Sequence, residues 1–122
     1  TVHPEDSIDL VANMMEWERI RHVPVEDHDH RLVGLVSYRA VLRVLAHGHG
    51  PESGTIPVSK IMRADPVTVT GETSTLDAIA LMRKHQIGAL PVVQDGRLIG
   101  LITEHDFLDI AAELLDGKLR EK

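Results

Sequence analysis

Two side chains in the C-terminal part of the sequence are spaced so that they could bind a phosphorylated ligand. Thr103 directly precedes an apolar helical run, and Asp106 follows it by three residues. The start of a helix carries unpaired N–H groups and a partial positive charge, which suit a phosphate, and Thr103 adds a hydroxyl donor. The Asp106 carboxylate would repel a phosphate but is a good acceptor for a vicinal diol such as a ribose. The same spacing also forms a capping box, which needs no ligand, and both interpretations stay open.

Two histidine clusters raise the possibility of a metal site. They are EDHDHR at residues 26–31 and HGHG at residues 47–50, and together they hold four of the eight histidines. Histidine combined with aspartate suits zinc or nickel. The first cluster falls in a predicted hairpin turn and the second in a linker, where solvated polar residues are common. We therefore expect no metal site, and zinc binding that disappears when His28 and His30 are replaced would contradict this expectation.

Catalysis is not expected either. The stretch EHD at residues 104–106 gathers acid and base groups, but neighbours on a helical turn point in different directions. Catalysis needs convergent groups with a nucleophile or a metal. The sequence predicts no catalytic residue and no catalytic cofactor.

The composition narrows the class of protein further. The chain has 122 residues, 43% of them hydrophobic, no cysteine and a formal net charge of −6. With 2% aromatic residues and an acidic balance, it lacks the basic patches and stacking rings that nucleic acid requires. No apolar run approaches the ~18 residues of a membrane-spanning helix, and no signal-peptide pattern opens the sequence. We expect a cytoplasmic protein that contacts neither nucleic acid nor membrane through this segment.

The elements that position these residues occur twice. Residues 1–25 align without a gap with residues 68–92, and GLVSYRA at residues 34–40 aligns with GLITEHD at residues 100–106. Each copy reads as strand, helix, strand, strand, helix, with the second copy starting from a strand at residues 66–70. The dipeptide Asp95-Gly96 between two apolar runs predicts a tight hairpin, because both residues must adopt positive φ. The closing helix is predicted from about Glu104 to Leu115.

The repeats define the predicted domain boundaries. Residues 1–46 form the first copy, residues 47–57 a Gly- and Pro-rich linker, residues 58–116 the second copy and residues 117–122 a charged tail. One unit of about 60 residues buries too little surface to be stable alone, so the two units are expected to pack together around a cleft. The first copy has no counterpart of residues 58–62, and no initiator methionine is present, so we expect a piece of a longer protein.

The ordered set of motifs resembles a cystathionine-β-synthase (CBS) domain. The resemblance rests on three stretches of the second copy: IM…PVTV at its start, LMRKHQIGALPVV where a helix leads into a strand, and GLITEHD where the last strand leads into the closing helix. Residues 1–46 resemble a second copy. The resemblance to such a CBS pair, or Bateman module, implies a mixed α/β (α+β) fold of two βαββα repeats. These repeats would have pseudo-twofold symmetry, with small three-stranded sheets packed by helices. It also implies a regulatory module that binds adenosine compounds between the repeats and dimerises.

The resemblance assigns ribose contacts to Asp106 and phosphate contacts to Thr103. It places an adenosine site in the second copy, for which the charge and sequence position of Arg63 and His105 add two phosphate candidates. The predicted binding residues are Ile61, Met62, Arg63, Val67, Thr68, Ile87, Gly88, Ala89, Leu90, Pro91, Thr103, His105 and Asp106. For Ile61 and Met62 an ordinary core role, and for Arg63 and His105 an exposed surface role, remain alternatives.

A second, weaker site is predicted in the first copy. Ala40 replaces the aspartate and cannot accept from a ribose, although Ser37 could still cap the helix. Bulkier residues replace the glycine and alanine of the presumed base wall. The weaker site would comprise Arg21, His22, Ser37 and Arg39.

The resulting prediction is a non-catalytic regulatory module. It would bind AMP, ADP, ATP or S-adenosylmethionine and signal to an attached or associated protein. The helix around residues 8–17 has two apolar stripes, one of Ile8, Val11, Ala12 and Met15 and one of Leu10, Met14 and Trp17. They favour a homodimer formed through the helices, and the alternative is that both stripes are buried between the two units of one chain. The alternative is a structural dimerisation module that binds no ligand.

Overall fold

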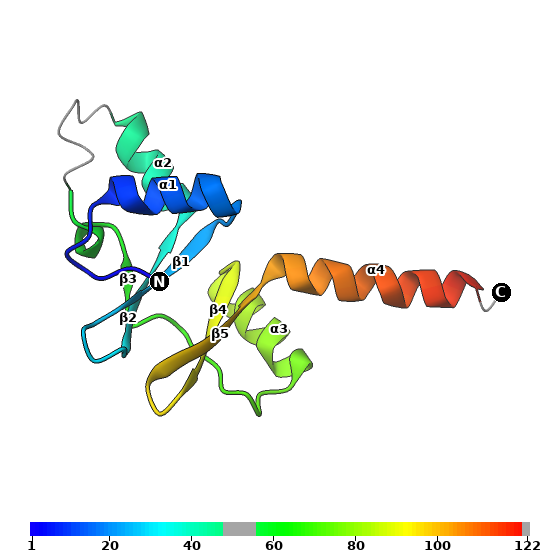
Figure 1. Ribbon diagram of the computed structural model, residues 1–122. Coiled ribbons are helices and arrows are strands. Elements are labelled where there is room, and N and C mark those ends of the chain that lie inside the picture. The colour runs from blue at the N-terminus through cyan, green and yellow to red at the C-terminus, as the bar shows by residue number, and fades with distance from the viewer. Residues whose placement is uncertain (48–55, 121–122) are drawn as a thin grey trace.

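The computed structural model describes residues 1–47 and 56–120 and contains two sheets flanked by helices (Figure 1). The first part of the chain forms α1 (Ile8–Glu18), β1 (His22–Glu26), β2 (Leu32–Ser37) and α2 (Tyr38–Ala46). A short 3₁₀ helix, η2 (Val58–Lys60), and the strand β3 (Arg63–Ala64) follow. The second part forms α3 (Thr75–His85), β4 (Ala89–Gln94), β5 (Arg97–Thr103) and α4 (Glu104–Arg120). The predicted mixed α/β class with two repeats is confirmed.

The same local interactions shape both repeats. The helices α1 and α3 both end at a left-handed residue, Arg19 (φ 55°) and Gln86 (φ 53°). The segment that precedes each of these helices also makes the same backbone bond. The Val2 N–H donates to the Pro24 carbonyl at 3.1 Å, and the Val69 N–H donates to the Pro91 carbonyl at 3.0 Å. These equivalent bonds give the predicted repeat a structural basis.

The two sheets differ from the predicted three-stranded pair. Within the described residues, the first sheet has the order β1-β2-β3, whereas the second consists of β4 and β5. The prediction of an extended strand at residues 66–70 is wrong, because this segment forms a single isolated bridge, between Val69 and Val92. Pro66 offers no N–H to a ladder, and the Thr70 N–H donates to the Thr73 hydroxyl at 3.1 Å. The chain therefore turns away after a single bridge.

The hairpin turn of the second repeat is confirmed. Asp95 and Gly96 adopt φ of 55° and 80°, and Gln94 pairs with Arg97 across the turn. The two hairpins also contact each other, since Arg31 bridges to Arg97 and the Leu32 N–H donates to the Gly96 carbonyl at 3.0 Å. The repeats are thus joined by backbone hydrogen bonds at their turns.

Each repeat has its own hydrophobic core. The first cluster contains buried Val11, Met15, Val23, Val25 and Val36, and the second contains Val69, Ala78, Met82 and Leu90. The segment that opens the second repeat packs into the first core, because Val58 is fully buried there and Ile61 and Met62 lie against it. The strand β3, which follows this segment, also joins the first repeat by pairing with β2. The repeats are consequently interlocked in their packing, while the proposed boundary at residue 58 stays a prediction.

The closing helices of the two repeats take different paths. Helix α2 contacts α1, whereas α4 continues to Arg120 and projects from the body of the molecule (Figure 1). The helix therefore passes the predicted end at Leu115. No helix in the described residues is both long enough and apolar enough to cross a membrane.

Candidate functional site

The start of α4 holds the two side chains that the sequence singles out. The Thr103 N–H donates to Asp106 Oδ2 at 2.8 Å, and the Thr103 hydroxyl donates to the same oxygen at 3.3 Å. This is the return half of a capping box, in which the acid satisfies the N–H of the residue before the helix. Asp106 Oδ1 takes part in neither bond. The carboxylate can therefore hold the helix start with one oxygen and accept from a ligand with the other.

In the first repeat, the start of α2 is capped by a different hydrogen bond. Ser37 Oγ accepts from the Ala40 N–H at 3.2 Å, which is the ordinary hydroxyl cap. Ala40 has no carboxylate, so the equivalent position offers no acceptor to a diol. The hydroxyl residue is thus explained by capping in the first repeat, whereas an acceptor at the fourth position exists only in the second.

The segment Ile87–Pro91 lies directly beside the start of α4. Ala89 pairs with Thr103 across β4 and β5, and the Glu104 N–H donates to the Gly88 carbonyl at 3.0 Å. The side chains of Ala89, Leu90 and Pro91 are buried, whereas Ile87 and Gly88 are half-buried. A ligand at this place would therefore meet the segment through the backbone and edge of Ile87 and Gly88.

The opposite wall predicted from residues 61–68 is divided between the repeats. Ile61 and Met62 are half-buried against the first core, and Arg63 of β3 pairs with Leu35 of β2. This packing agrees with the alternative that Ile61 and Met62 are core residues. Val67 packs against the second core, and Thr68 is exposed. The contribution of these residues to a ligand wall stays a prediction.

The charged phosphate candidates remain available to solvent. Arg63 and His105 are both exposed, the first on β3 and the second in the first turn of α4. The residues of the weaker site behave differently from one another: Arg21 and Arg39 are exposed, while His22 is half-buried and faces Ser37 in the register of β1 and β2.

His22 reaches across to the second repeat. A methyl group placed on Gly88 would lie 3.5 Å from His22 Cε1 and 3.2 Å from Glu104 Oε1. Burial lowers the pKa of His22 below 6.5; Glu104 opposes this effect and Arg21 adds to it. The imidazole is consequently neutral at neutral pH and acts as a packing group at the joint between the repeats.

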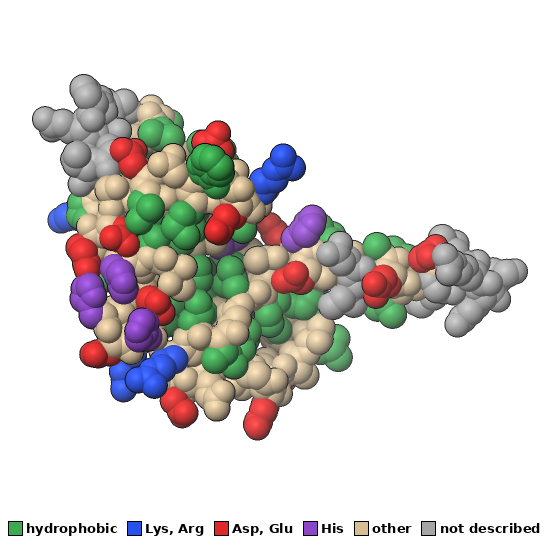
Figure 2. All heavy atoms as spheres, in the orientation of Figure 1, with side chains coloured by type: hydrophobic (Ala, Val, Ile, Leu, Met, Phe, Trp, Pro, Cys, Tyr) green, Lys and Arg blue, Asp and Glu red, His purple; other side chains and the backbone are tan. Residues whose placement is uncertain are grey.

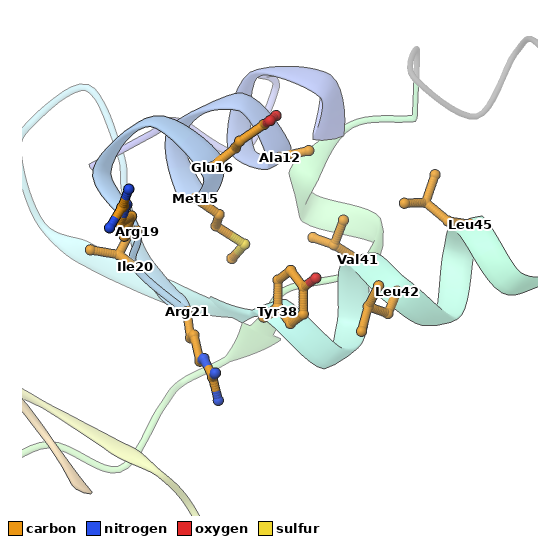
Figure 3. Close-up of a pocket in the computed structure, with 10 residues that line it drawn as sticks. All are labelled: Ala12, Met15, Glu16, Arg19, Ile20, Arg21, Tyr38, Val41, Leu42 and Leu45. Carbon is orange, nitrogen blue, oxygen red and sulfur yellow. The ribbon is translucent and has the colours of Figure 1, made fainter. Parts of the chain in front are cut away.

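A separate groove lies between α1 and α2 (Figure 3). It measures about 550 Å³ and is lined mainly by apolar side chains, including Met15, Ile20, Val41, Leu42 and Leu45. Glu16, Arg19, Arg21 and Tyr38 also line it. From α1 the groove is lined by Ala12 and Met15 of the apolar stripe that also carries Ile8 and Val11, whereas Trp17, on the other stripe, is 85% exposed and does not line it. The spacing of α2 relative to α1, which creates the groove, could not be inferred from either stripe.

The histidines of the first hairpin lie close to the N-terminal segment, and Figure 2 shows a group of histidines on this face. The rings of His3 and His28 stack at a centroid distance of 4.6 Å, and His28 Nε2 is 2.6 Å from Glu5 Oε1. Within the part of the chain that the structure describes, no three His, Cys, Asp or Glu side chains are grouped so that they could hold a metal ion. Of the second cluster, residues 48–50 lie outside the described residues.

Comparison with known proteins agrees with this architecture. The sequence model of the CBS domain matches residues 1–47 and 58–113. A CBS domain-containing protein of Dictyostelium discoideum is 30% identical over 125 residues, covering 95% of this chain and 86% of that protein. Inosine-5'-monophosphate dehydrogenase of Methanocaldococcus jannaschii is 34% identical over 109 residues. That match covers 88% of this chain but 21% of the enzyme.

A solved structure extends the comparison to a ligand complex. The crystal structure of CBSX2 in complex with AMP matches this fold with a TM-score of 0.80 and 29% identity. The match covers 93% of this chain and 87% of that one.

Proposed function

The chain belongs to the CBS-domain family, and from this premise we propose that it is a non-catalytic regulatory module with one adenosine-binding site. The ligand is AMP, ADP, ATP or S-adenosylmethionine, and occupancy is passed to an attached or associated protein. The observation that carries the proposal is the arrangement of Thr103 and Asp106 at the start of α4, beside the backbone of Gly88. The AMP complex of CBSX2 supports the ligand class.

The chemistry of the α4 start suits the two polar parts of such a ligand. The Asp106 Oδ1 atom accepts from the ribose hydroxyls, in bonds that are strengthened by the negative charge of the carboxylate. The helix N-terminus and the Thr103 hydroxyl attract the phosphate. Arg63 and His105, both exposed, add positive charge or donors for a longer phosphate chain. S-adenosylmethionine has no phosphate, and its methionine carboxylate would be the anionic group at this place.

The first repeat is proposed to hold no competent adenosine site. Ala40 lacks the carboxylate, and Ser37 Oγ already accepts from the Ala40 N–H. The bulkier Arg21 and His22 stand where the second repeat has Gly88 and Ala89. We therefore expect one adenosine bound per chain.

Calorimetric titration of the purified chain with AMP, ADP, ATP and S-adenosylmethionine tests the proposal. Asp106→Ala should weaken binding of the preferred ligand by about 1.5–3 kcal/mol, the range for losing charge-assisted hydrogen bonds, or roughly ten- to a hundredfold in Kd. Glu113→Ala is the matched control, since it removes the same charge from an exposed position further along α4. Unchanged affinity in Asp106→Ala would return Asp106 to a capping role alone.

A module without a ligand is the competing function. It predicts no heat and no thermal shift with any of the four compounds at millimolar concentration, and this outcome would refute the sensor. Because the chain spans about a fifth of the dehydrogenase that it resembles, the protein that receives the signal is left open. The ligand would influence that protein only to the extent that it binds the closed and open arrangements of the repeats with different affinity.

We further propose that a second copy of the chain covers the groove between α1 and α2. Leu42 and Leu45 are 43% and 56% exposed along this groove. Leu42→Glu should shift the protein from dimer to monomer in sedimentation velocity, because a charge would be buried in the contact. Leu76→Glu, at an exposed position in the first turn of α3, is the control and should leave the dimer intact. A monomeric wild-type chain would contradict the dimer without affecting the ligand proposal.

A further inference from the structure

The two repeats meet at a small joint built from His22, Gly88 and Glu104. His22 is the first residue of β1, Gly88 precedes β4, and Glu104 is the first residue of α4. The position of a methyl group on Gly88 would be 3.5 Å from His22 Cε1 and 3.2 Å from Glu104 Oε1. A side chain of the first repeat and a carboxylate of the second therefore cover the same glycine.

The joint depends on a difference between the repeats. Arg21 and His22 of the first copy correspond to Gly88 and Ala89 of the second. Gly88 has no side chain on the face that His22 approaches, whereas the corresponding Arg21 carries a long one. Two equivalent backbone bonds flank the contact, from the Tyr38 N–H to the Arg21 carbonyl at 2.7 Å and from the Glu104 N–H to the Gly88 carbonyl at 3.0 Å. The residues on either side of the contact are thus tied into the backbone hydrogen-bond network of their own repeats.

The surroundings of the ring favour its uncharged form. Burial lowers the pKa of His22 below 6.5, the nearby Glu104 carboxylate raises it in part, and Arg21 lowers it further. Ser37, which faces His22 from β2, carries no charge. The loss of hydration in the joint therefore outweighs the attraction of the one carboxylate that acts on the ring.

We propose that His22 is a proton-sensitive contact between the repeats, and that proton uptake by its imidazole loosens their packing at Gly88. A half-buried imidazolium is poorly hydrated, and it regains hydration when the joint opens. The neutral ring, in contrast, packs there without penalty. The direction follows from linkage: a group that binds fewer protons when folded stabilises the fold less and less as the pH drops below about 6.5.

The position of the joint connects it to the α4 start. Glu104 lies between Thr103 and Asp106, and its N–H is bonded to the Gly88 carbonyl. Opening the joint therefore disturbs the first turn of α4. This inference goes beyond the proposed function, because it concerns the ligand-free chain and holds whether or not an adenosine compound binds.

Nuclear magnetic resonance of the histidine rings in the ligand-free protein tests the proposal. The signal that is missing in His22→Gln identifies His22, and its midpoint should lie below 6.5. The Gly88 and Ala89 amide shifts should follow the same midpoint, although these residues belong to the other repeat. Glu104→Gln should lower the midpoint further, because it removes the attractive carboxylate.

Amide hydrogen exchange measures the loosening itself. The protection of the Glu104 and Tyr38 amides, corrected for intrinsic rates, should fall as the pH decreases through the His22 midpoint. It should not fall in His22→Gln, whereas His85→Gln, at an exposed histidine of α3, should behave like the wild type. A His22 midpoint at or above 6.5, an unaltered midpoint in Glu104→Gln, or protection that does not depend on His22 would each overturn the proposal. None of these outcomes depends on ligand titration, so a failed ligand proposal is recognised separately.

Discussion

Substitution of Gly34 by alanine offers a direct test of how the opening of the second repeat packs on the first. Gly34 is buried in β2, opposite Ala64 of β3. A methyl group at this position would lie 2.5 Å from Met62 Sδ, 3.0 Å from Met62 Cγ and 3.3 Å from the Arg63 carbonyl oxygen. Met62 must turn away and the backbone at Arg63 must yield. The variant therefore loosens the contact through which residues of the second repeat complete the first core.

The expected loss of stability is the balance of two effects. Forcing an additional methyl group into a packed site costs about 1–3 kcal/mol. The alanine also restricts the unfolded chain, which offsets roughly 0.5 kcal/mol of that cost. We expect Gly34→Ala to lower the free energy of unfolding by about 1–2 kcal/mol. This corresponds to a decrease of roughly 0.5–1 M in the urea midpoint at an unchanged slope.

The second repeat contains the matched control. Gly100 occupies the equivalent position, but a methyl group there would lie 3.8 Å from Val92 Cβ, an ordinary van der Waals contact. Gly100→Ala should consequently be neutral or stabilising by about 0.5 kcal/mol. Urea unfolding followed by circular dichroism, at one fixed protein concentration, compares the two variants. Equal stability of Gly34→Ala and Gly100→Ala would refute the packing argument.

Two further predictions concern a helix cap and a turn. Ser74→Ala should cost about 1 kcal/mol in urea unfolding, because Ser74 Oγ accepts from the Asp77 N–H at 3.1 Å. Ser7→Ala should cost less, since Ser7 makes no side-chain bond at the start of α1. Hydrogen bonds from the backbone N–H groups of Arg31 and Asp29 lower the pKa of Asp27 below 3.8. This contribution to stability is complete above pH 3.8 and is lost as the pH falls through the folded-state pKa, so Asp27→Asn should show a smaller loss of stability at the acid end of a thermal unfolding series.

Much of the local structure could be predicted because it depends on neighbouring residues. The turn at Asp95-Gly96 follows from the need for positive φ, and the start of α4 follows from Thr103 and Asp106. The repeat itself predicted that both halves would adopt the same order of elements. The family resemblance then indicated which end of α4 to consider for a ligand.

Other features depend on contacts between residues distant in sequence. The third strand of the first sheet comes from Arg63–Ala64, in the segment that opens the second repeat. The strand predicted at residues 66–70 for the second sheet is reduced to the Val69–Val92 bridge. From the sequence, His22 is predicted to be a bulky residue that narrows a pocket in its own repeat. The structure places it over Gly88 of the other repeat, a contact that no pattern within either copy encodes.

The sequence by itself determined the family, the duplicated order of helix, strand, strand and helix, and the asymmetry between Asp106 and Ala40, because these follow from residue identity, spacing and local hydrogen bonding. Only the tertiary structure decided that one oxygen of Asp106 already serves Thr103, that Met62 belongs to the packing of the first core, and that His22 joins the repeats. These features arise when two similar units pack together. Volume, hydration and close approach between them are properties of the pair, and the sequence of one unit does not contain them.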